Sequence, residues 1–215
     1  MKQIFIALTT LVLLMTGSAS AEKEVAPEIE FNFPSDTRMD QYFSEYKHEL
    51  RKAVFEDYLQ ARADGNVFHS NAPWFLSVDA KLSYDEKFTA VEIHAYSFRG
   101  GAHGIPYLDV LYFSKDSNRP MRFQDLLKPE AASELSRLSR KRLVALGFKA
   151  NDEWMLKGTK PLLENFRLIV PRKDKVEIVF DAYQVAPYAA GTPKVELSWD
   201  ELKPLLRPVF QTASE

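Results

Sequence analysis

The sequence predicts an α+β domain in which an antiparallel sheet meander packs against a long N-terminal helix. Apolar residues recur at steps of three and four between Met39 and Ala61, as on an amphipathic helix. Segments 74–82 and 88–98 then alternate apolar and polar residues, as half-buried strands do. A helical insertion, a second strand pair and a short C-terminal helix follow. Helices that are grouped apart from the strands, rather than alternating with each one, indicate the α+β class.

The first 21 residues have the pattern of a secretory signal peptide. Lys2 gives a positive start, residues 4–15 are apolar apart from two threonines, and Ala19-Ser20-Ala21 offers the small residues of a cleavage site. The apolar run is short for a membrane span, and no positive flank follows it, so an uncleaved anchor is the less favoured alternative. We therefore expect a periplasmic or secreted protein with no stable membrane anchor after residues 1–21 are removed.

The next segment, 22–35, is acidic and irregular and is predicted to be a flexible lead-in. Ile29, Phe31 and Phe33 nevertheless alternate and could add an edge strand. The folded domain is expected over 36–210, either as one unit or as two packed halves, 36–85 and 86–210.

The long helix is expected to begin at a Ser35 or Asp36 cap and to run to about Asp64, where Gly65 supplies a left-handed stop. The strands at 74–82 and 88–98 are joined by a short polar turn, and the segment 107–113 makes the third strand. One face of this meander would then be buried against the helix. The residues predicted to form that face are Trp74, Leu76, Val78, Ala80, Val91, Ile93 and Ala95.

The middle of the chain is predicted to be helical. Residues 123–127 suggest one turn, Pro129 and Gly147 bound a longer helix, and 151–156 suggest another. Strands are expected at 166–170 and 176–180, with a brief strand at 195–197. The sequence Ser198-Trp199-Asp200-Glu201 is a capping box that starts the terminal helix.

Composition excludes several classes of site. The chain has no cysteine, and therefore no disulfide or thiolate metal site. A net charge of −2 argues against a nucleic-acid binder, which would show a basic excess. The basic residues at 137–142 fit a solvated helix face better than a binding patch.

No catalytic signature is present, and we expect no enzyme, no cofactor and no metal. The sequence lacks a Gly-x-Ser-x-Gly elbow, and its histidines show no i, i+4 pair. If the hairpin turns about Gly101-Ala102, His94 falls nearly opposite Asp109 as a cross-strand pair. A hydrolase that uses His94 or His103 remains an alternative.

Two loops of small residues carry large polar side chains and are the candidate binding residues. In the first, Gly100, Gly101 and Gly104 permit a tight turn that exposes His103, although a plain hairpin would use the same glycines.

In the second loop, Tyr183 and Tyr188 flank Pro187 and precede Gly191. Tyrosines beside small residues suit protein interfaces and sugar contacts. We expect Tyr188 to be exposed and Tyr183 to pack back on the core.

Taken together, these segments resemble the extracytoplasmic domain of RsiV-type anti-sigma factors. The resemblance implies protein or cell-wall recognition outside the cytoplasm, because RsiV acts as a receptor for lysozyme. The chain departs from RsiV in lacking a membrane helix and a sigma-binding segment, so a lysozyme-type muramidase inhibitor or scavenger is expected. A binder of peptidoglycan or glycan fragments is the alternative. The matching segments are 100–104, 108–113, 123–127, 176–180, 183–191 and 195–206.

Overall fold

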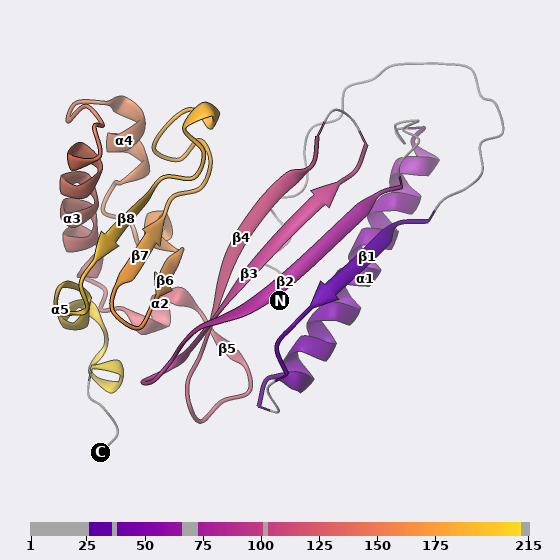
Figure 1. Cartoon of the computed structure of the whole chain (residues 1–215), viewed down its shortest axis with the longest axis horizontal. Helices are drawn as coiled ribbons and strands as arrows, with labels where there is room; N and C mark the ends of the chain where they lie inside the picture. Colours follow the sequence, from indigo (N-terminus) through magenta and orange to yellow (C-terminus); the bar gives the residue numbers. More distant parts are fainter. Residues whose placement is uncertain (1–25, 36–37, 66–72, 101–102, 212–215) are drawn as a thin grey trace.

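The computed structural model describes residues 26–35, 38–65, 73–100 and 103–211. It consists of two parts: a long sheet lined by one helix, and a smaller sheet covered by shorter helices (Figure 1). The predicted α+β class is confirmed. The expected signal peptide lies outside the described residues.

The first part is built on a five-stranded sheet in the order β1-β2-β3-β4-β5. The strands β2, β3 and β4 form the predicted antiparallel meander, while β1 pairs parallel to β2. The strand β1 lies within the expected lead-in, where alternation allowed an edge strand. The bounds are β1 Glu28–Asn32, β2 Phe75–Asp85, β3 Thr89–Phe98, β4 Ile105–Phe113 and β5 Pro120–Met121.

The long helix α1, Asp40–Ala63, covers one face of this sheet (Figure 1). Its predicted start at Ser35 or Asp36 is wrong for Ser35, which lies before the helix, and Asp36 lies outside the described residues. Met39 occupies the N-cap position, but its side chain makes no capping hydrogen bond. The side chain is 2% exposed, so its burial holds the start of the helix in place instead. Gly65 ends the helix at φ +68°, as predicted.

A first hydrophobic core fills the space between α1 and the sheet. It contains Met39, Phe43 and Val54 from the helix. The predicted apolar faces of β2 and β3 point into it, with Val78 and Ile93 almost completely buried. Their alternation follows from the two-residue period of a strand. Rings at the N-terminal end of α1 pack edge to face on Phe113.

The second part has a three-stranded antiparallel sheet, where the sequence analysis expected a strand pair and a brief further strand. The capping box at Ser198 is confirmed, since its hydroxyl accepts the Glu201 N–H at 3.2 Å. The bounds are β6 Ile169–Pro171, β7 Val176–Val179, β8 Lys194–Leu197, α2 Phe123–Leu126, α3 Ala131–Ala145, α4 Glu153–Gly158 and α5 Trp199–Leu202. Four 3₁₀ turns are η1 Leu163–Phe166, η2 Tyr188–Ala190, η3 Lys203–Leu205 and η4 Pro208–Phe210.

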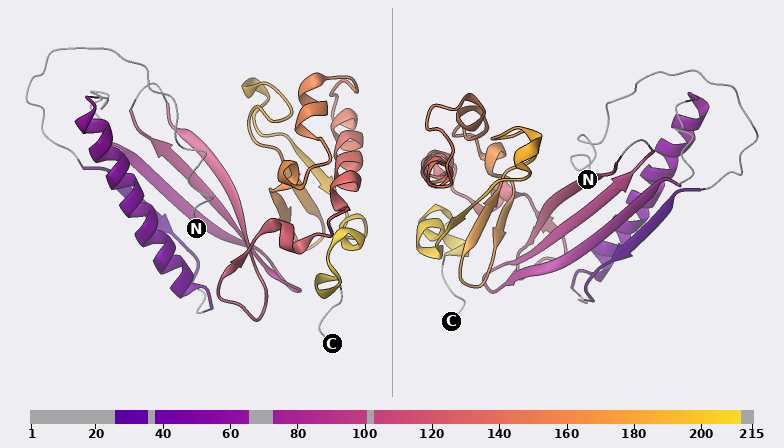
Figure 2. Two further views of the ribbon diagram at one scale, coloured as in Figure 1. Left: turned by 180° about the vertical axis from the view of Figure 1, so that it is seen from behind. Right: turned by 45° about the horizontal axis from the view of Figure 1, so that its top comes forward.

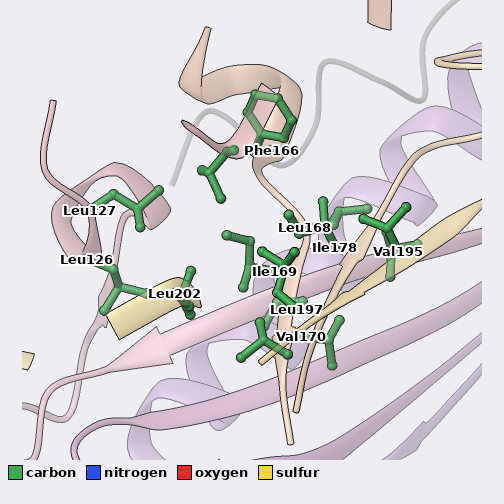
Figure 3. Close-up of a cluster of buried hydrophobic side chains, with 14 of the residues drawn as sticks. Leu126, Leu127, Phe166, Leu168, Ile169, Val170, Ile178, Val195, Leu197 and Leu202 are labelled. Atoms are coloured by element: carbon green, nitrogen blue, oxygen red, sulfur yellow. The ribbon is translucent and has the colours of Figure 1, made fainter. Parts of the chain in front are cut away.

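A second core joins this sheet to its helices and to the lower end of the first sheet. Phe166, Leu168 and Ile178 lie at its centre (Figure 3). Phe88, in the turn between β2 and β3, and Tyr112, on β4, enter the same core. The Tyr112 hydroxyl donates to the Ile169 carbonyl at 2.5 Å. The alternative of two halves, 36–85 and 86–210, would place a boundary between β2 and β3, which are paired in one sheet. In the structure the two parts divide after β5 (Figure 2).

A charged cluster closes this junction. Arg172, in the β6–β7 turn, contacts the carboxylates of Glu92 on β3 and Glu177 on β7. Both glutamate side chains are only 7% exposed. Lys194 adds a contact of 3.2 Å to Glu177, and His94 Nε2 lies 3.2 Å from Glu92. The guanidinium fork thus bridges two buried carboxylates from different sheets.

Over the described ranges, no helix combines the length and the apolar character needed to cross a membrane.

Candidate functional site

The β3–β4 loop is held by a contact between Tyr96 and Gly104. A Cβ at Gly104 would lie 2.3 Å from the Tyr96 ring, so only glycine lets the ring cover the backbone there. The Gly104 N–H donates to the Tyr96 hydroxyl at 3.1 Å. Gly100 adopts φ +91°, as the glycine pattern suggested, and Gly101 lies outside the described residues.

This contact leaves His103 at the tip of the hairpin with an exposed side chain. Its Nδ1 lies 3.1 Å from the Gly104 carbonyl oxygen, which orients the ring. Tyr96 is 41% exposed and Ile105 is 63% exposed, on opposite faces of the hairpin, because Ile105 pairs with Ser97 and Tyr96 pairs with Pro106. The end of the hairpin therefore presents an exposed imidazole and one exposed apolar residue on each face, which we call the hairpin tip (Tyr96, His103 and Ile105).

The predicted pairing of His94 with Asp109 is wrong. His94 faces Leu108 and Asp109 faces Ile93, because the register of β4 against β3 differs by one residue from the expected one. A shift of one residue moves a side chain to the opposite face of the sheet. The ring of His94 instead contacts Glu92 on its own strand.

Asp109 has a structural role at the edge of β4. The strand β5 pairs with Tyr112 and Phe113, and no other strand among the described residues pairs with the rest of that edge. The Asp109 carboxylate accepts the Val110 N–H at 2.9 Å, and Pro106 has no N–H to offer. Burial raises the pKa of Asp109, although the Val110 N–H and Arg167 favour its charged form. These features protect the edge against pairing with another chain.

The second loop differs from the expectation for Tyr183, which is 60% exposed rather than packed on the core. Its φ of +68° turns the side chain outward, a left-handed conformation that a tyrosine rarely adopts. Tyr188 lies in η2, but its side chain lies outside what the structure describes. Gly191 has φ +70°, as its place in the loop suggested.

Trp154, which no sequence motif marks as a site residue, lies beside Tyr183. The two ring centroids are 6.1 Å apart at an angle of 35°, and Trp154 is 40% exposed. The sequence feature that could have indicated this site residue is a tryptophan directly after Asp152 and Glu153, at the start of a helix. Asp152 does cap α4, accepting the Met155 N–H at 3.0 Å.

The two loops lie at the same end of the molecule but on different parts of it (Figures 1 and 2). Within the described ranges, no group of three or more histidines and carboxylates is arranged to hold a metal ion. The His94 ring contacts the Glu92 carboxylate, and the His103 ring contacts the Gly104 carbonyl oxygen. The geometry is that of a two-part α+β scaffold with exposed loops.

Part of this scaffold is similar to a known family. Residues 124–200 match the family described as "Protein of unknown function (DUF3298)". The peptidoglycan-N-acetylmuramic acid deacetylase PdaC of Bacillus subtilis (strain 168) is 29% identical over 139 residues. That match covers 63% of this chain but only 30% of the length of PdaC.

Two solved structures are similar. A DUF3298 family member from Bacteroides fragilis NCTC 9343 matches with a TM-score of 0.50 and 17% identity, over 80% of this chain and 70% of that chain. This likeness supports the fold. A DUF3298 family protein from Pseudomonas aeruginosa PAO1 matches with a TM-score of 0.46 and 20% identity, over 66% of each chain.

Proposed function

We propose that this protein is a binding protein of the cell envelope that recognises a lysozyme-type muramidase and inhibits or scavenges it. The observation that carries the proposal is the hairpin tip. Its exposed histidine lies at the end of the hairpin with an exposed isoleucine on one face and an exposed tyrosine on the other, and the Tyr96–Gly104 contact orders the loop before any partner binds. Interfaces use such pre-ordered aromatic and apolar anchors, because little conformational entropy is lost when they bind.

Two further observations support the location and the ligand. The sequence has a signal-peptide pattern, which favours a periplasmic or secreted protein. The relative PdaC is named for a reaction on peptidoglycan, the polymer that muramidases cleave. The resemblance to RsiV-type domains adds lysozyme itself as the partner to test.

Ile105→Asp is expected to weaken binding to a c-type lysozyme by at least about thirtyfold, because an interface would have to bury an unpaired carboxylate. Folding should be unaffected, since the side chain is largely exposed. Titration calorimetry measures the affinity, and circular dichroism checks the fold.

The matched control is Val209→Asp, which places the same charge at another exposed aliphatic residue far from the tip. It should bind as the unchanged chain does. Equal affinities for the two variants would remove the hairpin tip from the interface.

The wall-glycan alternative has its own supporting observation elsewhere in the fold, the pair of exposed aromatic rings Trp154 and Tyr183.

A further inference from the structure

We propose that Trp154 and Tyr183 form a carbohydrate-binding platform that stacks on the ring of a neutral glycan. This site is separate from the hairpin tip and independent of muramidase binding. It lies on the second part of the molecule, where α4 meets the turn at residues 181–184.

The first argument is backbone strain at Tyr183. Its φ of +68° lies in the left-handed region, which costs a residue with a Cβ more than it costs glycine. Such turn positions are usually taken by Gly, Asn or Asp. The strained backbone holds the Tyr183 ring beside Trp154 with most of its surface in solvent, where a ligand can reach it.

The second argument is the rigidity of the support under the two rings. The Gln184 side chain donates to the carbonyl of Gly158 at 2.9 Å and to that of Asn165 at 2.8 Å. It also accepts the Asp181 N–H at 3.0 Å, which closes the turn around Tyr183. Gly158 ends α4 against the backbone of Gln184, so the helix that carries Trp154 and the turn that carries Tyr183 are in direct contact.

The ligand class follows from the shape and charge of the platform. Two adjacent tilted rings match the apolar C–H face of a sugar and are far smaller than a protein interface, which needs about 800 Å² on each side. A nucleobase could also stack, but nucleic acid requires a cation excess. The charges of α4 with its cap, and of Asp181 with its ion-pair partner, nearly balance: Asp152, Glu153 and Asp181 stand against Lys157 and Arg167. A neutral glycan therefore fits best.

The test is a titration of the chain from residue 22 onward with chitotetraose, cellotetraose and maltotetraose, followed by tryptophan fluorescence. Trp154 is the indole exposed to solvent, since Trp74 is buried and Trp199 partly buried. We expect a saturable change with at least one glycan, and the comparison of the three separates N-acetylated from plain sugars. No saturable change with any of them would overturn the proposal.

Two variants assign the signal to the platform. Tyr183→Gly removes the ring together with its strain and should weaken glycan binding about tenfold, while Tm stays within about 3 °C. Trp154→Ala, followed by calorimetry, should lose binding as well. Phe55→Ala, which removes an equally exposed ring on α1, is the control that should bind normally. Normal binding by both platform variants would also overturn the proposal, and neither result depends on lysozyme.

Discussion

Gly158→Ala is expected to lower the free energy of unfolding by about 3 kcal/mol, because overpacking against rigid backbone is among the most damaging substitutions. A Cβ at this position would lie 2.0 Å from the Gln184 carbonyl oxygen and 2.7 Å from its carbon. Neither atom belongs to a flexible side chain, so α4 or the turn must move. For a domain of this size the loss corresponds to a fall in Tm of about 6–12 °C.

Urea denaturation of Gly158→Ala beside Gly191→Ala provides the comparison. Gly191 also gains a Cβ, but nothing lies within 4 Å of it and only its φ of +70° opposes alanine. Gly191→Ala should therefore cost about 1 kcal/mol. Equal losses in the two variants would mean that α4 and the turn are not in close contact.

Arg172→Met is expected to destabilise the junction of the two parts by about 2 kcal/mol, because it leaves the buried carboxylates of Glu92 and Glu177 without their shared cation. The effect is smaller than for a fully buried pair, since Arg172 is one-third exposed and Glu177 keeps its contacts with Lys175 and Lys194. Chemical denaturation at neutral pH measures it.

The matched control is Arg137→Met, which breaks an exposed pair with Glu134 and should cost less than about 0.5 kcal/mol. If Arg137→Met costs as much as Arg172→Met, the charged cluster does not hold the junction.

The same cluster predicts a pH dependence. Burial alone would raise the pKa of Glu177, but hydrogen bonds from Arg172 and Lys194 outweigh it and hold this pKa below its usual value. Stability from this pairing is therefore present above the unfolded pKa, near 4.5, and is lost as the pH falls through the folded value. Arg172→Met should accordingly lose less stability than the unchanged chain between neutral and acidic pH.

Most of the fold could be predicted because its elements follow local rules. Apolar residues spaced by three and four positions predicted α1, and the alternation of apolar and polar residues predicted the buried faces of β2 and β3. The register between β3 and β4 could not be predicted from the sequence, because several small residues in the loop allow the chain to turn at more than one position. Alternation along β3 places the Glu92 side chain on the face that points away from α1. The second part of the molecule covers this side chain, and no local sequence pattern reveals such a long-range contact.

The candidate site was predicted only in part. The glycines of the hairpin loop pointed correctly to an exposed His103, since tight turns require them. The outward position of Tyr183 depends on a left-handed backbone that tyrosine rarely adopts, so the predicted packing of its ring on the core was wrong. The pairing of Trp154 with Tyr183 depends on the close approach at Gly158, which only the tertiary structure shows.

The central proposal, recognition of a muramidase, is tested most directly by titration calorimetry of the chain from residue 22 onward against a c-type lysozyme, with a lytic assay on cell-wall material in parallel. We predict a one-to-one complex and loss of lytic activity at equimolar protein. No heat of binding together with unchanged lysis would contradict the proposal.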